Sequence, residues 1–187
     1  LDAAGNAQHA AAFVEGLRAA GVGAAAKHFP GLGAVTGNTD FTTDGIVDTT
    51  TTRNGPEVQA FAQAIRAADP GMVMISLATY TAIDPDEPAA FSPTVIDGML
   101  RGDIGYGGVV ISDSLSASAV SAIAPAELGV RLVQAGGDLA CVNDPAFAQP
   151  ILDGLRARAR GDAAFAERVT QSARRVVSLK LALGLAQ

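Results

Sequence analysis

The stretch that decides the fold is Gly108-Val109-Val110-Ile111-Ser112-Asp113-Ser114-Leu115. A short continuous apolar run, followed directly by an aspartate, is typical of a strand that is covered on both faces of a parallel sheet. Further strand candidates occupy residues 22–28, 72–76 and 138–142. Helical patterns follow the four strands in turn at residues 56–68, 93–101, 125–135 and 145–158. Strands that alternate with helices predict an α/β fold with a parallel sheet and right-handed crossovers.

Two more helical patterns complete the order of elements, one before the first strand at residues 8–20 and one at the end at residues 164–183. Residues 29–55 and 79–91 are expected to form loops, because glycine, threonine, asparagine and acidic residues dominate them. A complete eight-stranded barrel takes about 250 residues. Four strands in a chain of 187 residues therefore fit either an open sheet or part of a barrel.

Composition excludes several classes of protein. The formal net charge of −6 argues against a general nucleic-acid binder, which needs a basic face. No apolar stretch reaches the ~18 residues of a membrane-spanning helix. One cysteine excludes an internal disulfide framework, and one cysteine with two histidines offers no zinc pattern. We expect no metal and no organic cofactor.

Polar side chains follow two of the strand candidates. Lys27 and His28 end the first strand candidate, and Asp113 ends the third. Functional groups of parallel α/β folds collect at these carboxyl ends, so a cation and an imidazole there are suited to binding sugar hydroxyls or an anion. Asp113 is placed as a nucleophile or a base. The alternatives are a histidine bonded to a carbonyl and an aspartate that caps the next turn.

A carboxylate in the long loop is the remaining candidate for chemistry. Asp40 lies in the glycine-rich segment after the first strand, and a long loop of this kind can reach over a site. Loop carboxylates are more often simply solvated. An open α/β phosphate binder is disfavoured, because Gly31-Leu32-Gly33 lacks the second half of either phosphate-binding fingerprint.

Two motifs resemble glycoside hydrolase family 3, and within it the bacterial β-N-acetylhexosaminidases. They are Lys27-His28-Phe29-Pro30-Gly31-x-Gly33 and Gly108-Val109-Val110-Ile111-Ser112-Asp113-x-Leu115. The resemblance covers essentially the whole chain. It implies a (β/α)8 barrel that cleaves terminal β-linked sugars with retention, through a covalent glycosyl-enzyme intermediate. It assigns the nucleophile to Asp113 and the sugar-holding pair to Lys27 and His28. Phe29–Pro30 becomes a candidate cis peptide bond.

The sequence departs from this family at the acid/base. The hexosaminidase branch carries Asp-Ser-His on the loop after this strand, and an ungapped count places Asn38-Thr39-Asp40 there. Asp40 thus stands where the histidine is expected, and Leu32 replaces a second histidine of the first motif. A carboxylic acid with a raised pKa can protonate a leaving oxygen, so Asp40 is our candidate acid/base. The alternative is a catalytically silent carbohydrate-binding member of the family.

The resemblance also predicts how the chain is organised. Residues 1–187 are expected to form one partial domain, the C-terminal half of a (β/α)8 TIM barrel, strands 5–8. A half barrel exposes two sheet edges and an apolar interior. We therefore expect as partner the N-terminal half of the barrel or a second copy of the chain. The expected substrates carry terminal β-linked N-acetylglucosamine or glucose, with a role in cell-wall glycan turnover. A secreted or cell-envelope location is favoured over a cytoplasmic one.

Overall fold

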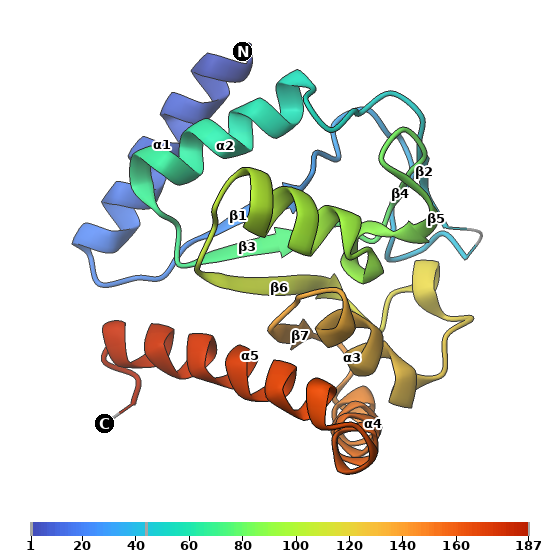
Figure 1. Cartoon of the computed structure of the whole chain (residues 1–187). Helices are drawn as coiled ribbons and strands as arrows, with labels where there is room; N and C mark the ends of the chain where they lie inside the picture. The colour runs from blue at the N-terminus through green and yellow to red at the C-terminus, as the bar shows by residue number, and fades with distance from the viewer. Residues whose placement is uncertain (1, 44, 187) are drawn as a thin grey trace.

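The computed structural model describes residues 2–43 and 45–186 and confirms the α/β prediction. Four strands form one fully parallel sheet in the order β1-β3-β6-β7 (Figure 1). These strands are β1 (Ala25–Phe29), β3 (Met72–Ile75), β6 (Val109–Ser114) and β7 (Leu139–Cys141). Each matches a strand candidate of the sequence, and no end differs from the prediction by more than three residues.

Helices follow the strands as predicted. The α-helices are α1 (Ala3–Ala19), α2 (Pro56–Ala68), α3 (Pro125–Gln134), α4 (Ala148–Gly161) and α5 (Ala163–Ala182). The segment expected as a helix over residues 93–101 is a π-helix, η2 (Thr94–Asp103). A π-helix has hydrogen bonds between residues five apart, and here the Gly98 N–H donates to the Pro93 carbonyl at 2.9 Å. The Ser92 hydroxyl accepts the Val95 N–H at 3.1 Å, so this serine caps the helix as predicted.

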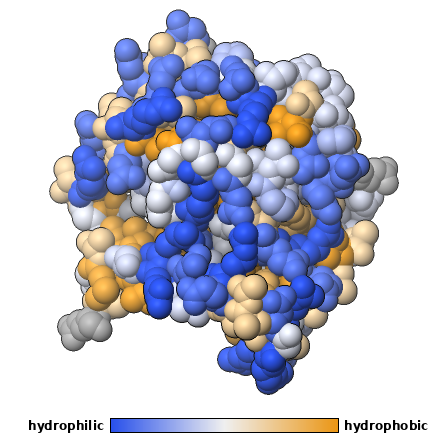
Figure 2. All heavy atoms as spheres, in the orientation of Figure 1, coloured by the Kyte–Doolittle hydropathy of each residue, from blue (hydrophilic) through white to orange (hydrophobic). Residues whose placement is uncertain are grey.

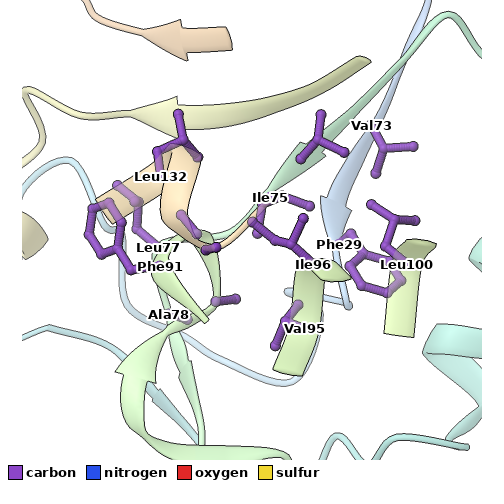
Figure 3. Close-up of a cluster of buried hydrophobic side chains, with 14 of the residues drawn as sticks. Phe29, Val73, Ile75, Leu77, Ala78, Phe91, Val95, Ile96, Leu100 and Leu132 are labelled. Atoms are coloured by element: carbon purple, nitrogen blue, oxygen red, sulfur yellow. The ribbon is translucent and has the colours of Figure 1, made fainter. Parts of the chain in front are cut away.

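One face of the sheet carries the core. Val73 and Ile75 of β3 are fully buried and pack against Val95, Ile96 and Leu100 of η2 (Figure 3). Side chains of α2 and α3 belong to the same cluster. Because alternate strand residues point to opposite faces, this face takes the odd-numbered residues of β3.

The opposite face is less covered. Met74 of β3 lies opposite Ile111 of β6, and Ile111 lies opposite Leu139 of β7. All three side chains are only partly buried. β1 and β7 are the outer strands, each with one neighbour among the described residues. The sheet therefore presents a second apolar face and two unpaired edges, as expected for part of a barrel.

Both expected loops contain short strands that the sequence did not indicate. These strands are β2 (Val47–Asp48), β4 (Thr79–Tyr80) and β5 (Asp84–Pro88), which form a three-stranded sheet. Strands of two residues are too short for an alternating pattern to identify. Asp48 is buried and accepts the N–H groups of Thr50 and Thr51, both at 2.7 Å. Burial alone would raise the pKa of Asp48, but the hydrogen bonds from Thr51 and Thr50 outweigh it and lower the pKa.

A buried carboxylate ties together the amino ends of the strands. Asp138, immediately before β7, has a fully buried side chain. Its Oδ2 accepts from Arg101 of η2 at 2.6 Å and from the Val110 N–H of β6 at 2.9 Å. Its Oδ1 accepts from Arg175 of α5 at 3.0 Å. Arg101 also donates to the Gly108 carbonyl at 3.0 Å. The Asp138 carboxylate therefore connects β6 and β7 with η2 and α5.

We predict that Asp138→Ala destabilises the fold by about 3–5 kcal/mol, because it leaves the largely buried Arg101 without its charged partner. Urea unfolding of the variant measures this loss. Asp153→Ala is the matched control, since Asp153 pairs with Arg156 at 3.7 Å on an exposed face of α4. Exposed pairs of this kind contribute less than about 1 kcal/mol. An equal loss in the two variants would contradict the role given to Asp138.

Candidate active site

Side chains from two strands that are not neighbours meet at the carboxyl end of the sheet. His28 belongs to β1 and Asp113 to β6, and β3 lies between these strands. β3 ends at Ile75, which lies opposite Ser112, so Asp113 stands one residue beyond the end of β3. The His28 Nε2 atom therefore reaches to 3.8 Å from the Asp113 Oδ2 atom. Both side chains remain accessible, at 23% and 19% exposure.

The backbone of β1 is irregular at the same place. Both the Lys27–His28 and the Phe29–Pro30 peptide bonds are cis. The second confirms the sequence prediction, whereas the first was not predicted. The pairing of β1 with β3 also shifts register between Ala26 and Phe29. Lys27 itself is exposed and His28 is half-buried.

Opposing effects set the protonation of His28. Burial is the largest and lowers the pKa of the imidazole below its usual value. The Asp113 carboxylate raises the pKa, Lys27 lowers it, and the Asp40 carboxylate raises it. The balance is a lowered pKa, which favours the neutral imidazole at pH 7. The structure thus brings Asp113, Lys27 and Asp40 within electrostatic reach of His28.

Asp40 is held on a tight turn. Its N–H donates to the Asn38 Oδ1 atom at 2.9 Å, and the Phe41 N–H donates to the Asn38 carbonyl at 3.1 Å. The turn is joined to the segment after β6, where the Ser118 N–H donates to the Asp40 carbonyl at 3.3 Å. The Asp40 turn is therefore bonded to the segment that follows the strand of Asp113, and Asp40 is half-buried there.

The orientation of the Asp113 carboxylate has two determinants. Oδ1 accepts the N–H of Ser114 at 2.8 Å, and Oδ2 is the atom that faces His28. This hydrogen bond is an alternative to the turn cap considered for Asp113 from the sequence, because the donor is the next residue of the same strand. An accessible carboxylate with one oxygen fixed is suited to nucleophilic attack by the other.

Sequence reasoning missed one residue of this surface. Cys141 ends β7, where the shifted register places it opposite Ser114, and the charges of Asp113 and Lys27 both act on its thiol. Burial raises the pKa of its thiol, the Asp113 carboxylate raises it further, and Lys27 lowers it. A lone cysteine carried no spacing signal that could place it beside the nucleophile candidate.

Neither a metal centre nor a membrane span is found in the part of the chain that the structure describes. Within residues 2–43 and 45–186, no group of His, Cys, Asp and Glu side chains is arranged to hold a metal ion. No described helix is long and apolar enough to cross a bilayer.

Residues 2–179 match the Glycosyl hydrolase family 3 N terminal domain. The chain belongs to glycoside hydrolase family 3. A β-hexosaminidase of Tolumonas auensis is 35% identical over 158 residues, which cover 80% of this chain and 45% of that protein. A β-hexosaminidase of Stenotrophomonas maltophilia is likewise 35% identical, over 156 residues.

Solved structures agree with this assignment. The β-N-acetylhexosaminidase of Beutenbergia cavernae superposes with a TM-score of 0.92 at 45% identity, over 96% of this chain and 53% of that one. The β-N-acetylglucosaminidase of Thermotoga maritima gives 0.78 at 26% identity, over 97% and 39%. The fold is thus TIM-barrel-like, and the chain spans about half the length of the relatives it matches.

We predict that Asp113→Asn lowers the pKa of His28 further, because the carboxylate favours the charged imidazolium. Two-dimensional NMR of the histidine ring during a pH titration measures the change. Asp153→Asn, on the exposed face of α4, is the control and leaves the titration unchanged. A His28 pKa that rises or stays constant in Asp113→Asn would contradict the contact between the two side chains.

Proposed function

We propose that the intact protein is a retaining glycoside hydrolase that removes terminal β-linked N-acetylglucosamine or glucose, with Asp113 as nucleophile. The observation that carries this proposal is the meeting of His28 and Asp113 over the end of β3, at 3.8 Å, in a family 3 chain. The names of the relatives favour N-acetylglucosamine as the sugar. Such an activity fits the turnover of cell-wall glycans.

The proposed reaction has two displacements. In the first, Asp113 Oδ2 attacks the anomeric carbon, the glycosidic C–O bond breaks, and an acid gives its proton to the departing oxygen. The product is an ester between the sugar and Asp113. In the second, the same group takes a proton from water, the water oxygen attacks the anomeric carbon, and the Asp113 carboxylate leaves. Two inversions give overall retention of configuration.

Asp40 is the proposed acid and base. Its turn is hydrogen-bonded to the segment that follows Asp113, which supports a place beside the reacting bond. Its carboxylate also raises the pKa of His28, which supports a place near the imidazole. Lys27 and His28 are proposed to hold sugar hydroxyls. A neutral imidazole both donates and accepts one hydrogen bond, and the ammonium of Lys27 donates only.

We propose that the chain is the C-terminal half of the barrel, strands 5–8, and that the N-terminal half completes it. An apolar groove runs between α1, β1 and α2, and Phe13 on its rim is 70% exposed. Hydrophobic residues also gather around the C-terminal end of α5, where Leu181 and Leu185 are 51% and 72% exposed (Figure 2). Exposed apolar side chains that gather in this way support a face that a partner covers. Native mass spectrometry of the protein from its source organism tests this, since a self-paired 18.8 kDa chain would contradict it.

A second candidate is a catalytically silent carbohydrate-binding protein. The presence of Asp40 where relatives are expected to carry histidine favours it. The accessible carboxylate of Asp113 opposes it. Covalent labelling separates the two candidates, because a binder holds a sugar without forming an ester.

We predict that a 2-fluoro glycoside with a dinitrophenolate leaving group labels the intact protein at Asp113. The fluorine slows both steps, and the activated leaving group restores the first step without help from an acid. Peptide mapping by mass spectrometry locates the adduct. Asp113→Asn is expected to show no label and to lose activity by about 10³-fold or more. An intact protein that binds the sugar and remains unlabelled would favour the silent binder.

For Asp40 we predict a dependence on the leaving group. Asp40→Asn should slow hydrolysis of a natural disaccharide by about 10²–10⁴-fold, because its leaving oxygen needs a proton. The dinitrophenyl glycoside should react in the first step at close to the wild-type rate. Asp86→Asn, at an exposed position of β5, is the control. Equal losses on both substrates would exclude Asp40 as the acid.

A further inference from the structure

Three serines at alternate positions connect the carboxyl end of β6, and the residues just after it, to the end of β7 and the residues that follow β7. They are Ser112, Ser114 and Ser116, and we call them the serine ladder. The Ser112 hydroxyl accepts the Cys141 N–H at 3.0 Å. The Ser116 hydroxyl accepts the Asn143 N–H at 3.0 Å and the Asp144 N–H at 3.3 Å. Ser114 lies between them, and its hydroxyl contacts the Asn143 side-chain carbonyl and accepts the Asn143 N–H at 3.3 Å.

The ladder occupies the place where the backbone pairing of the two strands is interrupted. β6 and β7 are in register at Ile111 and Leu139, and the register shifts before Ser114 meets Cys141. Beyond the shift, the Leu115 N–H still donates to the Cys141 carbonyl at 2.8 Å. The N–H groups of residues 141, 143 and 144 instead find hydroxyl oxygens. Backbone N–H groups that lose their ladder partner need another acceptor, and here the serine hydroxyls replace the missing backbone carbonyls.

Asp113 lies within this ladder and on the other face of β6. Ser112 and Ser114 flank it, and neighbouring residues of a strand point to opposite faces. The Ser114 N–H is also the donor that fixes Asp113 Oδ1, at 2.8 Å. Ser114 is 6% exposed and Ser112 is fully buried, so both are firmly packed. The side chain of Ser114 therefore fixes the backbone group that orients the Asp113 carboxylate.

We propose that the serine ladder, with Asn143, is the positioning device of the nucleophile. Ser114 and Asn143 act through Asp113 and touch no substrate. The proposal rests on the proposed function, since it assigns the reacting carboxylate to Asp113. A displacement of about 1 Å at a reacting atom can slow a reaction by about 10²-fold, so hydrogen bonds on the far face of β6 can control the rate.

The test compares Ser114→Ala with Ser114→Thr in the intact protein. We expect Ser114→Ala to lower the rate of covalent labelling by the 2-fluoro dinitrophenyl glycoside about 10–100-fold. Its dissociation constant for a competitive sugar inhibitor should stay unchanged, because the sugar-holding residues are intact. Ser114→Thr keeps the hydroxyl and should label at close to the wild-type rate.

Two further variants complete the design. Ser121→Ala is the matched control, because its exposed hydroxyl donates to the Ser118 carbonyl at 2.7 Å and takes no part in the ladder. Asn143→Ala removes an exposed side chain and should slow labelling even if Ser114→Ala fails to fold. Wild-type labelling rates in both Ser114→Ala and Asn143→Ala would overturn the proposal. So would equal slowing by Ser114→Ala and Ser114→Thr.

Failure of the proposed function is distinguishable from failure of the ladder. If the wild-type protein is not labelled at all, the hydrolase assignment fails. The position of Asp113 is then read from the pKa of His28, which the Asp113 carboxylate raises. Ser114→Ala should lower the pKa of His28 relative to Ser121→Ala, because the carboxylate moves away. An identical pKa in these two variants would overturn the ladder's role independently of catalysis.

Discussion

The buried carboxylate of Asp138 is the contact on which the rest of the structure depends. It joins Arg101 of η2, Arg175 of α5 and the Val110 N–H of β6 at the amino end of the sheet. A buried charge tolerates only a narrow geometry, because each lost partner leaves a desolvated ion. The amino ends of β6 and β7 are therefore held in fixed positions relative to each other, and this sets where their carboxyl ends lie.

The amino and carboxyl ends of the sheet differ in the kind of polar contact that they contain. Charged groups bind one another at the amino end. At the carboxyl end, the serine hydroxyls bind backbone N–H groups on the face of β6 opposite Asp113, and the Ser114 N–H donates to the Asp113 carboxylate. This carboxylate stays accessible and faces His28 at 3.8 Å. This division is typical of parallel α/β folds, in which one end of the strands maintains stability and the other carries the chemistry. The serine ladder supplies rigidity to Asp113 without placing another charge beside it.

Local signals in the sequence were sufficient for the main elements. α2 spans the predicted residues, Pro56–Ala68, because Pro56 starts it and the turn from Asp69 ends it. Strand ends also identified His28 and Asp113, and their contact at the carboxyl edge agrees with that expectation. The sequence could not reveal β2, β4 and β5, because β2 and β4 have two residues each and β5 consists of acidic residues and prolines without apolar alternation. Nor could it reveal the serine ladder, which depends on a register shift between β6 and β7.

The stereochemistry of hydrolysis shows whether Asp113 is the nucleophile. If Asp113 forms an ester with the sugar, two inversions occur at the anomeric carbon. Proton NMR of the intact protein with a β-linked N-acetylglucosaminide, recorded before mutarotation, identifies the first anomer released. We predict the β-anomer. Release of the α-anomer would mean that water attacks the sugar directly, and Asp113 could not then be the nucleophile.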